Sequence, residues 1–311
     1  MRILVTGGAG FIGSHVVDAY VADGHAVAVL DSLEGGTRGN LNPEAEFYEA
    51  DVRDADAVGA AFARFRPEAV SHHAAHIHVV RSLEDPAYDA NVNIVGGLNV
   101  WKAACDVGAG RFVFASSGGA IYGQPSALPV TEDQPSAPLS PYGLSKWAFE
   151  RFLLLPRASG PTPVVLRYAN VYGPRQGSRG EAGVVSIFAR RLREGRPCVI
   201  FGDGSMTRDY VYVADIVAAN RLALSGGDRD VFNIGSGEQT STSELFDALC
   251  GLTGRSGMLP EHAPERDGEV RRICLDADRA RRVLGWAPAH SLIEGLTRVV
   301  QSLETEPKGA V

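Results

Sequence analysis

The chain has 311 residues, of which 45% are hydrophobic and 22% charged, as expected for a large α/β unit with an appended lobe. Its net charge of −7 argues against a nucleic-acid partner. No secretory-signal pattern, no apolar stretch near the ~18 residues of a membrane span and no closely spaced cysteines are present. We therefore expect a cytoplasmic protein that does not contact a membrane.

Short apolar runs alternate with helical patterns over the first part of the chain, which is typical of βαβ units and a parallel sheet. Strands are expected at 2–7, 26–31, 45–51, 69–75, 111–117 and 163–173, and helices at 14–24, 56–65 and 93–108. This order predicts an α/β fold with a Rossmann-type doubly wound parallel sheet over residues 1–173.

The pattern changes after Pro174, where a polar, glycine-rich loop begins. Helices are expected at 184–195, at 240–254 and in two segments of 276–303, strands at 198–204 and 230–237, and a mixed unit at 208–224. Residues 174–311 are therefore predicted to form a smaller α/β substrate-binding lobe that partly interleaves with the sheet domain.

The first expected strand runs into the segment GGAGFIG and then into a helix. Gly8, Gly10 and Gly13 match G-x-G-x-x-G, and Gly7 opens the related longer spacing. Such glycines let the backbone approach a pyrophosphate at the helix N-terminus. Asp31 ends the next strand, where a carboxylate accepts from ribose hydroxyls and repels a 2′-phosphate, so the pattern predicts NAD rather than NADP.

A second pattern combines hydroxyl groups with a lysine. Tyr142 and Lys146 form Y-x-x-x-K, which places both side chains on one face of a helix. An ammonium near a tyrosine hydroxyl stabilises the phenolate and makes it a usable proton-transfer group. Ser116 and Ser117 end an apolar strand, at the sheet edge where ligands bind in open α/β folds. The alternative for Tyr142 and Lys146 alone is an ordinary surface pair.

Residues 71–80 contain four of the eight histidines. His72 and His73 point to opposite faces of a strand and cannot chelate one ion together, and no cysteine or well-placed carboxylate completes a ligand set. We therefore predict no metal. His76 and His78 are expected in the following loop, where they either touch the substrate or cap the loop; capping is favoured for His78.

The motifs TGGAGFIG, PYGLSK and LRYANVYGPRQ, with the serine-ended strand before YG, resemble the extended short-chain dehydrogenase/reductases, most closely the UDP-glucose 4-epimerases. The resemblance extends through GDGSMTRDYVYVAD, FNIGSGE and LGWAP and so covers nearly the whole chain. It implies an NAD-dependent enzyme that interconverts UDP-glucose and UDP-galactose, or a related UDP-sugar, at C4 through a transient 4-keto sugar.

The resemblance implies that Tyr142 is the catalytic base, that Lys146 lowers its pKa and holds the nicotinamide ribose, and that Ser117 hydrogen-bonds the reacting hydroxyl. The implied NAD site comprises Gly7, Gly10, Phe11, Ile12, Gly13, Asp31, Ser32, Asp51, Val52, Ala74, Ala75, Asn91, Tyr142, Lys146 and Tyr168. The implied UDP-sugar contacts are Ser117, Asn170, Val184, Phe201, Arg208, Tyr210, Arg266 and Glu269. Counting on from Arg266 and Glu269, Ile273 falls at the position where family members restricted to UDP-glucose and UDP-galactose carry a tyrosine beside the sugar C2. The alternative is that Ile273 packs in the core of the lobe.

The nearest alternative is a nucleotide-sugar 4,6-dehydratase or another NAD-dependent enzyme of this kind, such as a UDP-glucuronate or UDP-N-acetylglucosamine 4-epimerase. In the family, a dehydratase carries an acidic group after the strand serine. Here Gly118, Gly119 and Ala120 provide none, which favours an epimerase.

The segments 93–107 and 142–155 are apolar around much of their circumference, more than one sheet face requires. In the family, the matching helices pair across a two-fold axis as a four-helix bundle. The resemblance therefore implies a homodimer whose contacts include Leu98, Trp101, Trp147 and Phe149.

Overall fold

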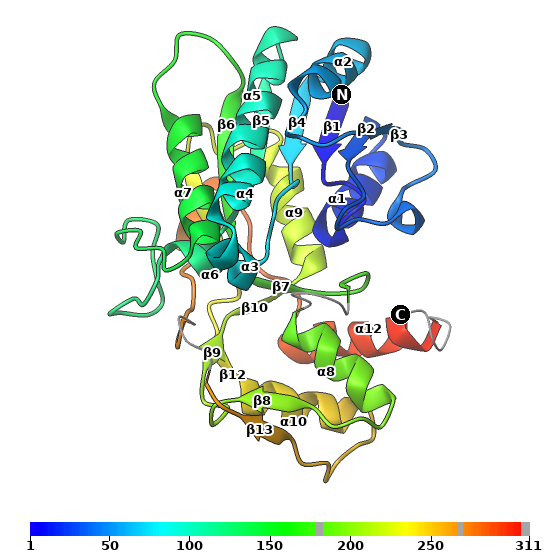
Figure 1. Cartoon of the computed structure of the whole chain (residues 1–311), viewed down its shortest axis with the longest axis vertical. Coiled ribbons are helices and arrows are strands. Elements are labelled where there is room, and N and C mark those ends of the chain that lie inside the picture. The colour runs from blue at the N-terminus through cyan, green and yellow to red at the C-terminus, as the bar shows by residue number, and fades with distance from the viewer. Residues whose placement is uncertain (178–182, 266–269, 306–311) are drawn as a thin grey trace.

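A computed structural model describes residues 1–177, 183–265 and 270–305. A seven-stranded sheet forms the upper part of the molecule in Figure 1, and a lobe of helices and short strands lies below it. The strand order is β11-β6-β5-β4-β1-β2-β3, and every neighbouring pair is parallel. The predicted doubly wound Rossmann-type fold is confirmed.

The sheet strands are short and lie close to their predicted positions. They are β1 (Arg2–Thr6), β2 (Ala26–Asp31), β3 (Glu46–Glu49), β4 (Ala69–His72), β5 (Arg111–Ser117), β6 (Thr162–Tyr168) and β11 (Val231–Ile234). The last of these comes from the C-terminal half of the chain and pairs with β6. The two halves of the chain therefore share one sheet.

Helices cover both faces of the sheet because the central strands are apolar on both sides. On one face lie α2 (Ala55–Phe65), α5 (Gly97–Asp106) and α7 (Pro141–Leu154); on the other lie α1 (Phe11–Ala22), α9 (Val213–Ala223) and α11 (Asp278–Leu284). Successive residues of β1 alternate between these layers. Leu4 joins the core under α2 and α5, whereas Ile3 and Val5 join the core under α1.

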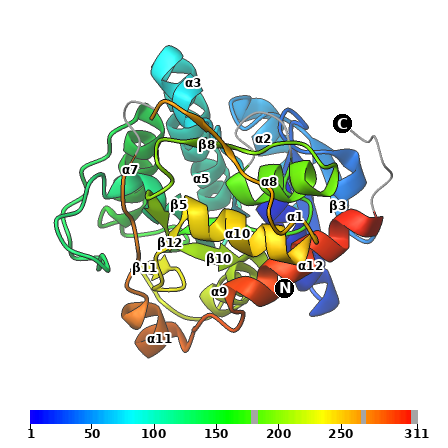
Figure 2. The same ribbon diagram turned by 90° about the horizontal axis from the view of Figure 1, so that it is seen from below.

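The lobe is built from α8 (Val184–Arg193), α10 (Thr242–Leu252) and α12 (Leu292–Thr305), which lie together in Figure 2. Its strands form three two-stranded pairs: β7 (Asn170–Tyr172) with β10 (Tyr210–Tyr212), β9 (Thr207–Arg208) with β12 (Thr240–Ser241), and β8 (Val199–Phe201) with β13 (Glu261–Ala263). A capping box between Ser241 and Glu244 starts α10.

A chain of short helices connects β4 to α5. After His76 come α3 (Val79–Glu84), α4 (Pro86–Ala90) and a π-helical turn, η2 (Asn91–Gly96). The sequence pattern predicts a loop at His76 and His78 and a helix only from residue 93. Helices of five or six residues carry too little periodicity to be recognised, although Asp85 caps α4 and Pro86 starts it. The remaining short helices are η1 (Arg38–Asn40) and α6 (Gly118–Ile121).

Two of the four residues predicted to make dimer contacts are core residues. Trp101 is 4% exposed and Phe149 is fully buried, both against the sheet. The prediction is therefore wrong for these two side chains: α5 and α7 are apolar on several sides because they also pack on the sheet and on neighbouring helices. Within the described residues, no helix has the length and apolarity needed to cross a bilayer.

Candidate active site

The turn between β1 and α1 forms a cradle lined by backbone. Gly7 has φ of +70°, and a Cβ there would lie 2.6 Å from the Ala74 nitrogen. A Cβ on Gly13 would lie 2.2 Å from the Gly7 carbonyl oxygen. Helix α1 begins at Phe11 with no side-chain cap at Gly10, so its first amides are available to an anion. This arrangement has the geometry of a pyrophosphate site. Of the other predicted cofactor contacts, Ile12 lies in the first turn of α1 and Ala75 follows Ala74.

Asp31 connects this cradle to the end of β2. Its side chain is 7% exposed, and its two oxygens accept from the backbone nitrogens of Ala9 (2.9 Å) and Leu33 (2.8 Å). Each carboxylate oxygen retains a further lone pair for a ribose hydroxyl. Ser32, which follows Asp31 directly, is exposed. The predicted ribose-binding carboxylate is therefore fixed in place.

Next to β3, the predicted cofactor contact Asp51 belongs to a charged cluster that no local sequence pattern indicates. Asp51 pairs with Arg53 at 2.5 Å, and this hydrogen-bonded guanidinium lowers the pKa of the Asp51 carboxyl. The Arg53 guanidinium also lies over the Tyr88 ring at 4.9 Å, and the Tyr88 hydroxyl donates to Glu34 at 2.7 Å. Val52, predicted as a cofactor contact, is 5% exposed and packs in the sheet core.

The predicted catalytic residues come from β5 and α7. Ser140 caps α7, and Pro141 starts it, so Tyr142 lies in its first turn and Lys146 one turn further along. The Tyr142 backbone nitrogen donates to the Ser82 hydroxyl at 3.2 Å, which ties the start of α7 to α3. Ser117 is the last residue of β5, at the carboxyl edge of the sheet.

Lys146 is buried, at 4% exposure, although it carries an ammonium group. Its Nζ donates to the Ala115 carbonyl at 2.9 Å and lies 4.9 Å from the centre of the Phe114 ring. Burial lowers the pKa of Lys146 to about 8, while the carboxylates of Asp89 and Glu150 oppose this shift. Lys146 is therefore a fixed cation at the end of β5.

The structure distinguishes Ser116 from Ser117. Ser116 is buried and its hydroxyl donates to Glu150, which also pairs with Arg167 at 2.6 Å. The Arg167 guanidinium in turn donates to the Tyr122 hydroxyl at 2.7 Å. Ser116 is therefore part of a buried structural network, and Ser117 is the strand-end hydroxyl that remains half-exposed.

The histidines of β4 and the residue after it have structural partners. His72 is 1% exposed, bonds the Thr6 hydroxyl at 2.7 Å and stacks on Phe114. The His73 ring bonds Ser71 at 2.9 Å and stacks with Tyr168, whose hydroxyl accepts from Asn220. Burial lowers the pKa of both imidazoles, that of His73 to about 3. Both rings are therefore neutral at ordinary pH.

His76 belongs to a second buried network, which sequence reasoning missed. Its Nδ1 lies 2.9 Å from Asp89, and Asn93 bonds the His76 backbone and the same carboxylate. Asn91, the predicted cofactor contact, is exposed on η2, whereas Asn93 is buried. An acidic residue in a helix is usually solvated, so no sequence signal marks Asp89 as buried. His78 occupies the N-cap position of α3.

The predicted UDP-sugar contacts are spread along the short strands of the lobe. Asn170 starts β7, and its side-chain oxygen is buried without a hydrogen-bond partner. Arg208 lies half-buried on β9, and its guanidinium donates to the Thr207 carbonyl. Val184 starts α8 and Phe201 ends β8, both half-buried. An orphaned buried amide oxygen is a group that a bound ligand can satisfy.

Tyr210 and Ile273 are buried, and two further predicted residues fall outside the described ranges. Tyr210 is 7% exposed in the lobe core, with its ring against Tyr172, and burial raises its pKa to about 12. Ile273 is 2% exposed and packs with a small apolar cluster that includes Val130. Of the two alternatives for Ile273, the structure places it in the core. Arg266 and Glu269 lie outside the described residues.

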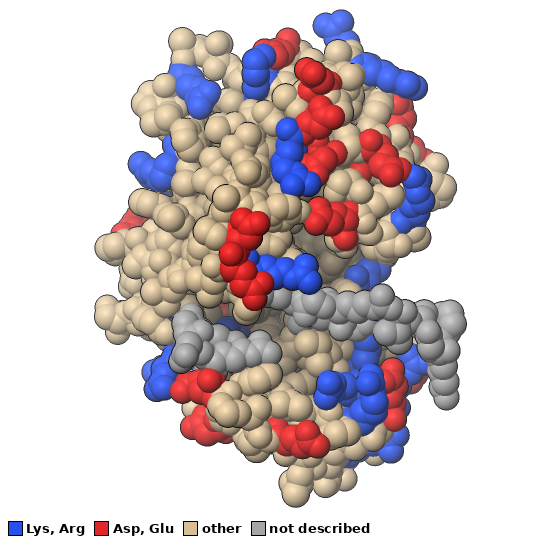
Figure 3. All heavy atoms as spheres, in the orientation of Figure 1, with Lys and Arg blue, Asp and Glu red and all other residues tan. Residues whose placement is uncertain are grey.

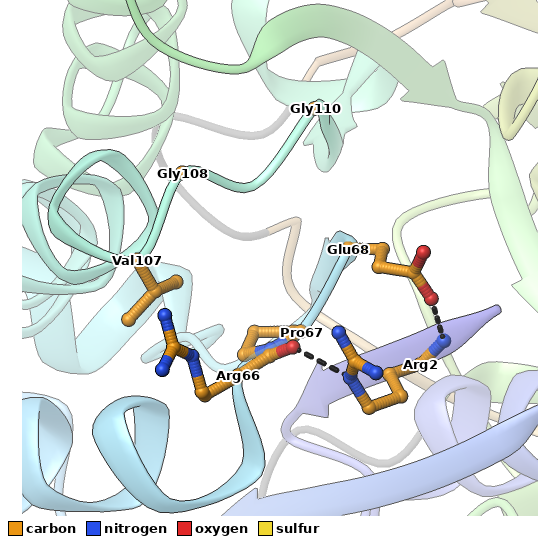
Figure 4. A pocket seen from close by; sticks show the side chains of 7 residues that line it. All are labelled: Arg2, Arg66, Pro67, Glu68, Val107, Gly108 and Gly110. Atoms are coloured by element: carbon orange, nitrogen blue, oxygen red, sulfur yellow. Dashed lines mark hydrogen bonds between the residues drawn. The ribbon is translucent and has the colours of Figure 1, made fainter.

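A hollow of about 370 Å³ lies at the opposite edge of the sheet (Figure 4). Among its lining residues, Arg2 starts β1 and Glu68 precedes β4, so the hollow faces the amino ends of the strands. Arg2 is tied to Glu68 and to the Arg66 carbonyl, each at 2.8 Å. Ligands of open α/β sheets bind at the carboxyl ends, so this hollow is not the active site.

The carboxyl ends of the sheet strands point toward the lobe (Figure 1), so the glycine cradle and the predicted catalytic residues face it. Acidic and basic side chains are mixed over the face seen in Figure 3, without a large field of one sign. No cluster of three or more histidine, cysteine or acidic side chains suited to a metal occurs within 1–177, 183–265 and 270–305.

Comparison with known proteins agrees with this geometry. The model of the NAD dependent epimerase/dehydratase family matches residues 3–235. The chain is 48% identical to a UDP-glucose 4-epimerase of Mycolicibacterium smegmatis, over 97% of this chain and 98% of that protein. It therefore belongs to the NAD dependent epimerase/dehydratase family.

Two solved structures are similar over their whole length. One is a Thermotoga maritima UDP-glucose 4-epimerase with UDP-glucose, at 47% identity and a TM-score of 0.95, covering 98% of this chain and 99% of that one. The other is a Thermus thermophilus UDP-glucose 4-epimerase in complex with NAD, at 44% identity and a TM-score of 0.93, covering all of both chains.

Proposed function

We propose that this protein is an NAD-dependent UDP-glucose 4-epimerase, which interconverts UDP-glucose and UDP-galactose. The observation that carries the proposal is the buried, main-chain-anchored Lys146 one helical turn from Tyr142, at the sheet edge that also holds the glycine cradle. Near-full-length relatives at 47–48% identity are epimerases with this specificity.

The residues at the cradle fit NAD. Gly7, Gly10 and Gly13 leave the α1 amides open to a pyrophosphate, and Asp31 offers fixed acceptors to the adenosine ribose while its charge disfavours a 2′-phosphate. Lys146 supplies a donor for the nicotinamide ribose. When bound, NAD supplies the reversible hydride transfer at the sugar C4.

The protein's own side chains transfer the proton and orient the sugar. The Tyr142 phenolate, stabilised by the neighbouring Lys146 ammonium, takes the proton of the sugar 4-hydroxyl and later returns it. Ser117 orients that hydroxyl from the end of β5. With NAD bound to take up and return the C4 hydride, the 4-keto sugar would turn its other face before Tyr142 returns the proton, so the product would differ only at C4.

The lobe supplies the contacts to the nucleotide sugar. The orphaned Asn170 oxygen is suited to accept from a hydroxyl of the nucleotide sugar, and the half-buried Arg208 guanidinium is suited to donate to the diphosphate. Arg266 and Glu269 are proposed as further diphosphate and ribose contacts from the sequence alone. A lobe that holds the nucleotide leaves the sugar free to turn.

A 4,6-dehydratase is less consistent with the site. Residues 118–120, which follow Ser117 and form most of α6, carry no acidic side chain. Elimination of water from the sugar requires an additional acid near the catalytic hydroxyl. The experiment that decides between the two is incubation with UDP-galactose. A UDP-glucose product without accumulated NADH supports epimerase, whereas a persistent 4-keto-6-deoxy sugar refutes it.

We also propose a homodimer through α5 and α7, by way of surface residues rather than Trp101 and Phe149. Leu144 is 51% exposed and Phe152 is 39% exposed, and they lie eight positions apart on one face of α7. Light scattering at micromolar concentration should give a dimer mass for the wild type and a monomer mass for Leu144→Glu. Leu259→Glu, at a lobe position 82% exposed, should remain dimeric.

The proposed location is the cytoplasm. All four cysteines are free thiols, and burial raises the pKa of Cys198 and Cys274. Unpaired cysteines are typical of a reducing compartment.

A further inference from the structure

The Asp89 carboxylate has no role in the mechanism described above, yet it is completely buried. Its Oδ1 accepts from the His76 Nδ1 at 2.9 Å and from the Asn93 amide at 3.0 Å. Its Oδ2 is also buried and has no hydrogen-bond partner. A buried carboxylate is stable only with hydrogen bonds or an opposite charge. Because Oδ2 has no hydrogen-bond partner, we expect a cation to stabilise the Asp89 charge.

The network around Asp89 is rigid. The Asn93 side-chain oxygen accepts from the His76 backbone nitrogen, and its amide donates to the His76 carbonyl, both at 2.9 Å. The same amide donates to Asp89. One asparagine side chain therefore fixes the loop that carries His76 and the carboxylate on α4 together.

Lys146 is a buried cation on which Asp89 acts. Helices α4 and α7 pack against each other, and the negative charge of Asp89 acts on the Lys146 ammonium more strongly than that of Glu150 does. Glu150 is already neutralised by its ion pair with Arg167. Asp89 is therefore the buried carboxylate whose charge remains for Lys146.

The other titratable groups on elements packed against α7 do not replace Asp89. His72 and His73 are neutral, as their lowered pKa values indicate. On α3, Arg81 and Glu84 are exposed, so water screens their charges. Strand β6 contributes Arg167, which is paired with Glu150, and β5 contributes Arg111, which is paired with Asp228. The remaining polar side chains of β5 and η2 are the uncharged Ser116, Ser117, Asn91 and Asn93.

We propose that Asp89, held by His76 and Asn93, is a positioning residue that supplies the fixed negative charge balancing the Lys146 ammonium, so that Lys146 stays protonated beside Tyr142. This inference rests on the proposed roles of Tyr142 and Lys146. His76 acts only as the donor that orients the carboxylate, and it does not contact the substrate.

The test is the pH dependence of kcat for UDP-galactose epimerisation. Asp89→Asn keeps the Oδ1 acceptor for His76 and Asn93 and removes only the charge. Without that charge the Lys146 ammonium loses its proton at lower pH, so the alkaline limb of kcat should move by about one pH unit toward acid, with KM nearly unchanged. His76→Lys neutralises the carboxylate without removing it and should shift the limb in the same direction.

Two further variants separate charge from structure. His76→Gln keeps a donor for the carboxylate and its charge, so its alkaline limb should stay in place, as should that of Glu84→Gln, which removes an exposed carboxylate from α3. If neither Asp89→Asn nor His76→Lys moves the limb, or if His76→Gln moves it equally, Asp89 is not the counter-charge. Absence of epimerisation by the wild type would instead refute the proposed function.

Discussion

The two walls of the proposed site are held in different ways. On the sheet wall, Asp31 and Lys146 are buried and hydrogen-bonded to the main chain, and the glycine cradle leaves no space for a Cβ. On the lobe wall, Asn170 and Arg208 stand half-buried on strands of three and two residues. The first wall is preorganised, whereas the second is assembled from short elements.

The difference matches the two tasks of the enzyme. Proton transfer requires groups fixed before the substrate arrives, because their electrostatic effect depends on position and on exclusion of water. Sugar recognition in an epimerase must tolerate a ring that turns between two faces. A wall of half-buried polar groups on short strands is suited to that tolerance. Changes to the sheet wall should therefore affect turnover most, and changes near the lobe wall should affect selectivity or stability.

The largest effect is expected for Tyr142→Phe. Loss of the hydroxyl removes the proton-transfer group and keeps the ring, so kcat should fall by about 10²–10⁴-fold. The fold and bound NAD should be retained, as measured by thermal unfolding and by the cofactor released on denaturation. Near-normal turnover would show that the sheet wall does not carry the chemistry.

The cradle should be the next most sensitive feature. In Gly13→Ala the new Cβ would meet the Gly7 carbonyl oxygen at 2.2 Å, so the turn must shift and NAD content should drop severely. The matched control is Gly59→Ala in α2, where a Cβ meets nothing within 4 Å. Helix propensity predicts that this control gains about 0.5–1 kcal/mol of stability. Full NAD occupancy in Gly13→Ala would contradict a backbone-lined phosphate site.

Acid should lower the free energy of unfolding of the protein because His72, in the sheet core, is buried as a neutral ring. Burial holds the pKa of His72 well below the usual value of 6.5, so below that pH the unfolded chain binds a proton that the folded chain does not. The free energy of unfolding should therefore decrease as pH falls below 6.5, by up to about 1.4 kcal/mol per pH unit for one histidine. Urea unfolding at several pH values measures the slope.

Two variants test whether His72 contributes to this pH dependence of the unfolding free energy. His72→Gln removes one titrating ring and should make the slope shallower by up to about 1.4 kcal/mol per pH unit, leaving the share of His73, whose pKa is also lowered. His262→Gln, at an exposed position on β13, should leave it unchanged. Equal slopes in wild type and His72→Gln would mean that other groups dominate acid unfolding.

The smallest effect on activity is expected for Ile273→Tyr. Because Ile273 packs beside Tyr122, Val130 and Leu275, the larger ring should overpack this cluster and cost about 1–3 kcal/mol of stability. The ratio of kcat/KM for UDP-galactose to that for UDP-N-acetylgalactosamine should stay near the wild-type value. A large rise in that ratio would mean that residue 273 limits the sugar pocket after all.

The sequence by itself determined the fold and most of the sheet wall. Periodicity placed the strands and long helices, and G-x-G-x-x-G with Asp31 and Y-x-x-x-K marked the cradle and the proposed catalytic pair, because these features depend on local spacing. The family resemblance assigned Ser117, and only the tertiary structure showed why Ser116 is engaged elsewhere, since its partner Glu150 is on α7. The tertiary structure also placed Trp101, Phe149 and Ile273 in the core and buried Asp89 on a helix that packs against α7. Burial and charge pairing depend on contacts between residues distant in the chain, and a local pattern does not record them.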